Sequence, residues 1–316
     1  QYFETDRLMS RAAKLAAYQK AAGETDPVAM LRRLELTLDE MAQVVERAHA
    51  RGIHAIVTVF STELVGPAET LAWDAYKTAS PDIVNFPLLA ALVATGKPLI
   101  VSTGASTWQE TQDAFYGPLE VRAAQLAMLQ CVSSYPTPRA QAAIAGLLQL
   151  PSDLIHSGGV FGYSDHTPDL DTGALAVRIG AAVLEKHLTH SRSAMGPDHA
   201  ASLEPAGFAE YARLARAAQR EAVGPGGAPA LMLASDPAYG PPEKAVLDCE
   251  RDVRTVSRQS VVSVGPIAAG TTITRAHLTI KRPGTGIPAC RLDEVVGRVA
   301  VRDVEGDVPI VEADLR

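Results

Sequence analysis

Short, nearly continuous apolar runs alternate with longer amphipathic stretches over the first two thirds of the chain. Apolar runs of strand length that alternate with helical patterns indicate a parallel sheet covered on both faces. The amphipathic stretches that predict helices include Leu36–Arg51, Ala140–Gln149 and Leu170–Gly180. The runs that predict strands are Ile53–Phe60, Ala75–Ala79, Pro98–Thr103, Leu126–Ser133, Val160–Ser164 and Ala182–Leu188.

Polar side chains stand where these predicted strands end, as they do at the active-site end of a (β/α)8 barrel. Six strands are visible, and Gln1–Phe3 resembles the end of another. We therefore predict an α/β fold, a (β/α)8 TIM barrel whose first strand and most of whose second are missing from this sequence. The alternative is an open doubly wound sheet, but no GxGxxG follows a first strand.

The composition changes after Arg220. A segment rich in Pro and Gly, including Gly224–Gly227, is typical of a linker. From about Val253 to Ile310, short Val/Ile/Thr runs separated by turns predict a small β-rich domain. The expected organisation is a barrel domain at 1–222, a linker at 223–252 and a C-terminal domain at 253–316.

Composition and charge narrow the possible functions. The chain is 47% hydrophobic, and Asp plus Glu (36) exceed Lys plus Arg (29), for a net charge of −7. This acidic balance argues against nucleic acid or an anionic membrane as partner, because both need a basic face. No apolar run approaches the roughly 20 residues that span a bilayer, and no signal peptide is visible. Three scattered cysteines fit a reducing compartment, so we expect a cytoplasmic enzyme.

Two histidines follow successive predicted strands. A parallel register would bring His166 and His187 to the same barrel mouth, where two neutral imidazoles suit a divalent metal ion with open positions. The alternative is a pair of ordinary buried histidines. Charged residues lie close to both histidines in the sequence, which favours a functional site. These neighbours are Asp165, Glu185, Lys186, Asp198 and His199.

Hydroxyl groups and one lysine at the strand ends predict an anion site, since each can donate to phosphate oxygens. The alternative for any one hydroxyl is that it caps the following helix. The SSYPTP turn would present Tyr135 to a ligand, or is simply a loop that prolines stiffen. The candidate anion ligands are Thr58, Lys77, Ser80, Ser102, Ser133 and Ser164.

Six motifs together resemble the N-acetylneuraminate (sialic acid) synthase family, which includes legionaminic and pseudaminic acid synthases and spore-coat polysaccharide proteins. They occur in the family's order over nearly the whole chain. The motifs are VSTGAS (Val101–Ser106), SSYPTP (Ser133–Pro138), GYSDHT (Gly162–Thr167), EKHLT (Glu185–Thr189), GPDHAASLEP (Gly196–Pro205) and KRPGTGI (Lys281–Ile287).

The resemblance implies a TIM barrel joined to an antifreeze-like (SAF) domain, in a domain-swapped homodimer. It implies that His166 and His187 bind Mn²⁺ or Mg²⁺, and that the six anion ligands above bind phosphoenolpyruvate. Arg282 matches the arginine that reaches across the dimer to the acylamino group of the sugar. The remaining amino-sugar positions are Gln1, Tyr135, Glu185 and Asp198, of which the last three are also the expected catalytic residues.

The implied reaction condenses phosphoenolpyruvate with a 2-acylamino sugar, similar to N-acetylmannosamine, to give a nonulosonic acid and phosphate. The family's strand-one glutamate and a phosphate-binding lysine precede the position of Gln1, so we expect this chain to be a poor catalyst. Ser133 and Ser191 replace the Asn and Asp of other members. Two alternatives are a non-catalytic sugar- or partner-binding barrel and a metal-dependent barrel hydrolase.

Overall fold

The computed structural model describes residues 1–221 and 236–316. The described chain forms two compact units. The first combines Gln1–Pro98 with Asp252–Arg316, and the second is Leu99–Arg251. The first part of the predicted linker at 223–252 lies outside the described residues.

Six strands lie at the positions predicted from the apolar runs, β1 and β2 in the first unit and β3 to β6 in the second. The strands are shorter than those runs because the adjoining loops are also buried: Phe60 is 5% exposed and Val132 is 3% exposed. The strands are β1 (Ile56–Thr58), β2 (Ala75–Thr78), β3 (Leu99–Ser102), β4 (Leu126–Cys131), β5 (Val160–Asp165) and β6 (Val183–Lys186).

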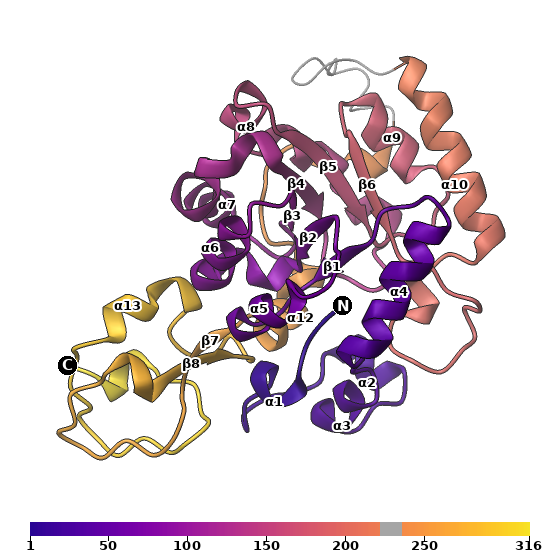
Figure 1. The fold of residues 1–316 in the computed structure, drawn as a ribbon. Helices are drawn as coiled ribbons and strands as arrows, with labels where there is room; N and C mark the ends of the chain where they lie inside the picture. Colours follow the sequence, from indigo (N-terminus) through magenta and orange to yellow (C-terminus); the bar gives the residue numbers. More distant parts are fainter. Residues whose placement is uncertain (222–235) are drawn as a thin grey trace. The chain divides into compact units, whose positions relative to one another are not determined.

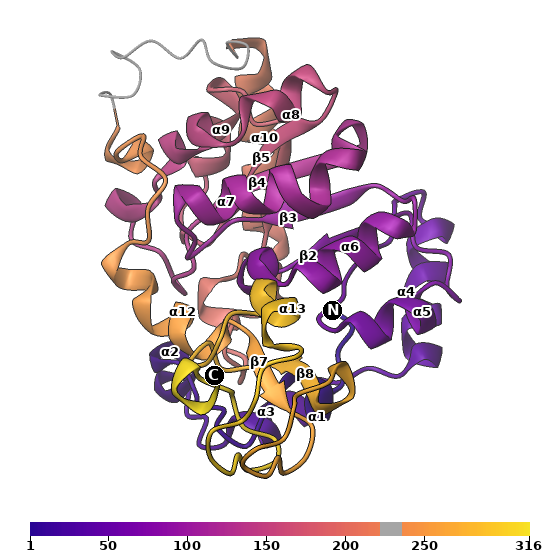
Figure 2. The same cartoon turned by 90° about the vertical axis from the view of Figure 1, so that its left-hand side faces the viewer.

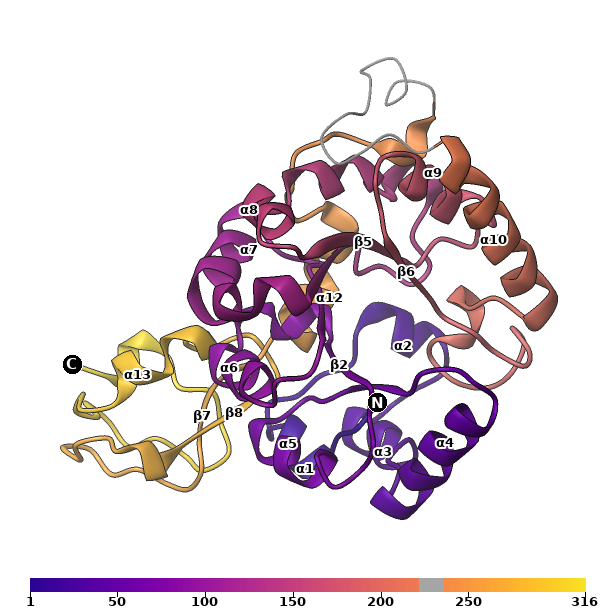
Figure 3. The same ribbon diagram turned by 45° about the horizontal axis from the view of Figure 1, so that its top comes forward.

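In the second unit, β3 to β6 pair in parallel, each with the next (Figure 1). Every residue of β4 is buried, as expected for a parallel strand with both faces covered. Helices α9 and α10 pack against each other beside β5 and β6 (Figure 3). The longer helices of this unit are α7 (Trp108–Ala114), α8 (Ser152–His156), α9 (Thr172–Arg178) and α10 (Pro205–Ala218).

This four-stranded sheet is strongly curled. Ser102 Oγ on β3 lies 3.5 Å from Glu185 Oε2 on β6, although β4 and β5 pair between these strands. In a flat sheet the first and fourth strands would be about 14 Å apart. The curl therefore turns one face of the sheet into an interior, as in a barrel.

In the first unit, β1 pairs in parallel with β2. Tyr2 forms an isolated parallel bridge with Val59, so Gln1–Phe3 runs beside the end of β1, as the sequence suggested. The predicted helix at 36–51 is α4, and its start is fixed by a capping box of Thr37 and Glu40. The helices before β3 are α1 (Thr5–Leu8), α2 (Ala17–Ala21), α3 (Pro27–Arg32), α4 (Leu38–Ala50), α5 (Val65–Ala68) and α6 (Phe86–Ala94).

The C-terminal part of the first unit contains all of α12 (Arg251–Ser257) but its first residue, followed by β7 (Ser260–Ser263), β8 (Leu278–Lys281) and α13 (Leu292–Val295). Strands β7 and β8 are antiparallel. Val261 on β7 and Leu278 on β8 pack into one buried apolar cluster. The end of β8 also pairs with the N-terminal segment, because Arg282 N donates to Leu8 O at 2.9 Å. Figure 2 shows α1 and α3 beside this strand.

Two predictions of local structure were wrong. The stretch Ala140–Gln149 is not one α-helix but two 3₁₀ segments, broken where Ala143 adopts a left-handed backbone with φ 47°. The C-terminal β pattern does not begin at Val253, which lies in α12. Among the described residues, no helix is both long and apolar enough to cross a membrane.

Candidate active site

Three serines lie at the carboxyl ends of neighbouring strands of the second unit. Ser102 ends β3, Ser133 follows β4 and Ser164 lies near the end of β5. They are 1%, 1% and 3% exposed, respectively. The Ser133 hydroxyl has no hydrogen-bond partner among the described residues. A buried hydroxyl without a partner is unfavourable, so Ser133 is suited to donate to a ligand.

The two predicted metal ligands come together. The ring centroids of His166 and His187 are 5.2 Å apart. His166 Nδ1 lies 2.7 Å from Val132 O, and donation to this carbonyl leaves Nε2 as the acceptor of the ring. Burial lowers the pKa of His166, which favours the neutral imidazole that metal ions bind.

Tyr135 and two carboxylates border the histidines. The Tyr135 ring is 4.3 Å from that of His166 and 6.0 Å from that of His187, between centroids. Asp198 Oδ2 lies 3.9 Å from His187 Nδ1, and Glu185 pairs in register with Ser164. Most of the site residues predicted in this unit therefore gather on one face of the curled sheet.

The donor set fits a metal ion that takes only two protein ligands. Within residues 1–221 and 236–316, no three His, Cys, Asp or Glu side chains converge on a common metal position. The paired imidazoles of His166 and His187 leave further positions for water and substrate oxygens.

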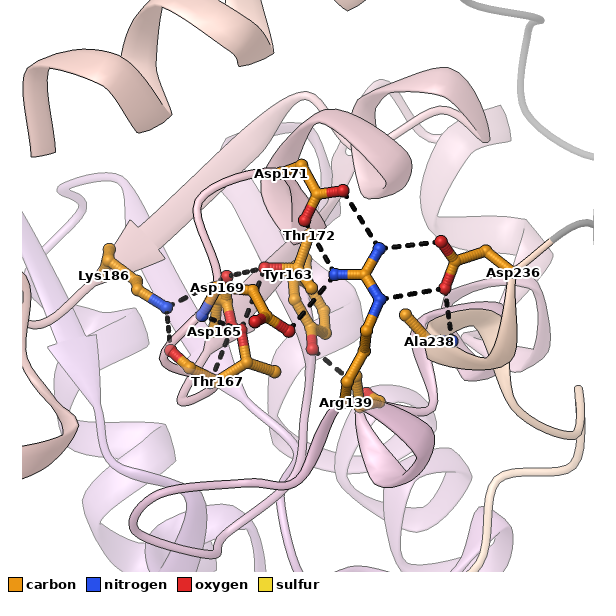
Figure 4. A network of polar contacts seen from close by, with 11 residues as sticks. Arg139, Tyr163, Asp165, Thr167, Asp169, Asp171, Thr172, Lys186, Asp236 and Ala238 are labelled. Atoms are coloured by element: carbon orange, nitrogen blue, oxygen red, sulfur yellow. Dashed lines mark hydrogen bonds and ion pairs between the residues drawn. The ribbon is translucent and has the colours of Figure 1, made fainter. Parts of the chain in front are cut away.

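The opposite face of the sheet holds a network of ion pairs (Figure 4). Asp165, the last residue of β5, lies between Ser164 and His166 in the sequence and pairs with Lys186 Nζ at 3.2 Å. Farther out, Arg139 joins the loop after β4 to the loop after β5, with Arg139 to Asp171 at 2.7 Å. These contacts fix the loops that carry Tyr135 and His166. The other partners of Arg139 are Asp169 and Asp236.

The first unit holds the remaining predicted site residues. Thr58 is the register partner of Lys77 on β2, and Ser80 follows that strand and is buried. Tyr2 N donates to Thr58 O at 2.7 Å, which places the N-terminal segment with Gln1 beside β1. These residues lie at strand ends, as the sequence predicted.

Arg282 belongs to the same unit. Its guanidinium carbon lies 5.5 Å from the centre of the Phe60 ring, in a cation–π contact within one chain. Its charge acts on Asp82, a completely buried carboxylate that sequence reasoning missed. Its only signal in the sequence is its position two residues after Ser80.

Buried hydroxyls and paired imidazoles at the carboxyl ends of parallel strands define a barrel enzyme with its site at one end of the sheet. Residues 1–226 match the NeuB family and residues 258–316 match the SAF domain. The chain belongs to the NeuB family. This confirms the resemblance and the predicted fold class.

Two relatives show the enzyme class. The chain is 29% identical over 316 residues to the N,N'-diacetyllegionaminic acid synthase of Campylobacter jejuni, which covers 99% of this chain and 89% of that protein. It is 30% identical over 311 residues to the synthase of the same name from Legionella pneumophila, covering 94% of this chain and 80% of that protein. The expected class, a sialic acid synthase-type transferase, is confirmed.

A solved structure supports the fold. The spore coat polysaccharide biosynthesis protein spsE of Bacillus subtilis superposes with a TM-score of 0.80 at 22% sequence identity. The match covers 100% of this chain and 85% of that one. At this identity the likeness concerns the fold.

Proposed function

We propose that this chain joins phosphoenolpyruvate to the open-chain aldehyde of an N-acylamino sugar, giving a nonulosonic acid and inorganic phosphate. The observation that carries the proposal is the cluster of Tyr135, His166 and His187 beside the buried serines of β3, β4 and β5. Anion donors and a polar cluster suited to a sugar then adjoin each other, as a reaction between these two substrates requires.

Phosphoenolpyruvate is the substrate assigned to the serines. Ser102, Ser133 and Ser164 would donate hydroxyl hydrogens to its phosphate and carboxylate oxygens, and the unpartnered hydroxyl of Ser133 supports this. The family resemblance assigns Thr58, Lys77 and Ser80 to the same ligand. Neutral donors with one cation hold an anionic substrate without needing a basic surface, which agrees with the acidic chain.

The amino sugar is assigned to the side of the histidines. A divalent ion held by His166 and His187, Mn²⁺ or Mg²⁺, would act as a Lewis acid that polarises the aldehyde. Tyr135 packs against both rings and would orient the sugar. Glu185 and Asp198 would accept hydrogen bonds from sugar hydroxyls or relay protons. The family resemblance also assigns two further residues to the sugar: Gln1 of the same chain, and Arg282 of a partner chain.

The bond changes follow from the two substrates. The methylene carbon of phosphoenolpyruvate forms a C–C bond with the aldehyde carbon, and the aldehyde oxygen takes up a proton. The adjacent carbon becomes an oxocarbenium centre, which a water molecule attacks while losing a proton. The tetrahedral intermediate then collapses to the ketone by C–O cleavage, and phosphate departs. The serine hydroxyls stabilise that leaving group throughout.

The first prediction tests this reaction through phosphate release. We expect release only when phosphoenolpyruvate, an N-acylamino sugar and Mn²⁺ are all present. Because His187 would hold the ion, H187A should reduce the rate by at least about 100-fold and weaken Mn²⁺ binding measured by calorimetry. H156A is the matched control, since the His156 side chain is 80% exposed on the surface.

Other outcomes would identify the alternatives. Hydrolysis of a sugar derivative without phosphoenolpyruvate would indicate the barrel hydrolase. Sugar binding without any phosphate release, in a chain that binds no Mn²⁺, would indicate the non-catalytic barrel. The family assignment favours neither alternative.

A further inference from the structure

Glu250 is a buried carboxylate that neither the motifs nor the proposed reaction uses. It lies directly before α12, in the stretch that leads into the C-terminal domain, and it is 1% exposed. A buried carboxylate is stable only when its oxygens are well hydrogen-bonded. The partners of Glu250 therefore indicate its role.

These partners are backbone groups at the ends of two strands. Glu250 Oε1 accepts from Ala105 N at 2.6 Å, in the loop after β3, and from Ser133 N at 2.7 Å, just after β4. Glu250 Oε2 accepts from Leu247 N at 2.9 Å, within its own segment. One oxygen atom thus joins the loops that follow two neighbouring strands.

This contact determines how Ser133 meets a ligand. With its N–H directed to Glu250, Ser133 can offer an anion only its hydroxyl, and that hydroxyl is buried and unpartnered among the described residues. The same carboxylate holds Ala105 in a left-handed backbone with φ 50°. A non-glycine residue adopts such a conformation only when its surroundings enforce it.

The geometry points to Glu250 as a positioning residue for the phosphoenolpyruvate site, acting through the backbone of Ser133 and of the loop after β3. Glu250, braced by Leu247 N, then acts as a latch: when its carboxylate is docked on Ala105 and Ser133, Ser133 presents its hydroxyl, and when it is released, the serine loses its fixed orientation. This inference rests on the proposed function, because it names the ligand of Ser133. It links the segment that enters the C-terminal domain to the anion site.

The experiment compares three variants of the whole chain. E250A removes both acceptor oxygens, whereas E250Q keeps Oε1 as an acceptor and loses only the bond from Leu247. D248A is the matched control, because the Asp248 side chain is 87% exposed and its ion pair with Arg251 is local. Calorimetry measures binding of phosphoenolpyruvate, and hydrogen exchange measures protection of the Ala105 and Ser133 amides.

We expect E250A to bind phosphoenolpyruvate at least about tenfold more weakly, because two buried N–H groups lose their acceptor. E250Q should stay within about threefold of the wild type, and D248A should be unchanged. Exchange at Ala105 and Ser133 should accelerate in E250A alone. In turnover, KM for phosphoenolpyruvate should rise while KM for the sugar stays constant, which a general loss of structure would not produce.

Two results would overturn the inference: E250A binding phosphoenolpyruvate like D248A, or unchanged amide exchange in E250A. If E250A does not fold, E250D serves instead. Its shorter carboxylate should weaken binding more than E250Q does, and the opposite order would count against the latch. A wild-type chain that binds no phosphoenolpyruvate but keeps both amides protected would refute the proposed function, and the role of Glu250 in that site with it.

Discussion

At the residue scale, the first unit contains a completely buried carboxyl group, that of Asp82. Neither of its carboxylate oxygens has a hydrogen-bond partner of normal geometry among the described residues. Burial raises the pKa of Asp82 to about 7, and the charges of Arg282, Lys77 and Arg258 oppose that rise. Because the pKa of this carboxyl group is close to neutral pH, the net charge of Asp82 and the three cations around it depends on pH.

This predicts a pH-dependent stability. The unfolded carboxyl titrates near 3.9, so between about pH 4 and pH 7 the folded chain binds more protons than the unfolded chain. The free energy of unfolding must then fall as pH rises through this window, by on the order of 4 kcal/mol at most. D82N removes the titration. Urea unfolding at several pH values should therefore show a smaller pH dependence for D82N than for the wild type.

The matched control is D248N, whose exposed side chain should leave the pH dependence unchanged. The comparison between variants matters, since other groups also titrate over this range. A D82N curve parallel to that of the wild type would show that Asp82 ionises normally in the folded chain.

At the scale of elements, the packing of α9 on α10 depends on a glycine. A Cβ atom built at Gly173 would lie 2.3 Å from the phenol oxygen of Tyr211, which is 3% exposed. The Tyr211 ring in turn lies over Lys186, whose Nζ is 5.3 Å from the ring centre. Close approach of the two helices thus supports the face of the sheet opposite the histidines.

G173A should therefore be destabilising. The added methyl group must displace the Tyr211 ring or separate the helices, and overpacking of this kind lowers the free energy of unfolding by about 1–3 kcal/mol. Denaturant unfolding measures the effect. G207A, on α10, is the control: its Cβ would have its nearest contact at 3.5 Å, and alanine favours a helix more than glycine does.

An unchanged or raised stability of G173A would mean that Tyr211 can leave its position freely. Lys186 would then also tolerate the substitution, and the packing between α9 and α10 would not constrain the sheet. A loss in G207A equal to that in G173A would point to a general sensitivity of these helices instead.

At the scale of the whole molecule, Arg282 raises the question of which chain completes which site. In the described chain it contacts Phe60 of its own unit, and its backbone N–H bonds to Leu8 O. The family motif predicts instead that Arg282 serves the sugar site of a partner chain. That exchange, and the domain-swapped homodimer, remain predictions.

Complementation between inactive chains tests the exchange. R282A alone should weaken use of the amino sugar far more than binding of phosphoenolpyruvate, and H187A alone should be inactive. If Arg282 acts on the partner chain, mixed dimers of the two variants contain one site with both residues intact. Activity should then reappear on mixing, up to about a quarter of the wild-type value for random pairing in C2 dimers.

No recovery on mixing, with mixed dimers demonstrated by native mass spectrometry, would place Arg282 in the site of its own chain. Equal losses in sugar use and phosphoenolpyruvate binding in R282A would contradict its assignment to the sugar.

The sequence predicted much of the site because its signals are local. A polar residue lies at or near the end of each predicted strand, and alternation along β5, β6 and the residues directly after them assigns Ser164, His166 and His187 to one face. The motifs then supplied roles for them. By contrast, the helix predicted at 140–149 was wrong because amphipathic spacing does not distinguish an α-helix from 3₁₀ turns interrupted by a left-handed residue.

By itself, the sequence determined the order of the strands, the placement of the histidines and hydroxyls at their ends, and the family. Only the tertiary structure decided which distant groups meet. Glu250 reaches Ser133 across 117 positions, and Ser102 meets Glu185 across 83. Such contacts depend on the curl of the sheet and on the return path of the chain, and neither leaves a periodic pattern in the residues. The burial of Asp82 and the anchoring of Ser133 are therefore properties of the folded chain.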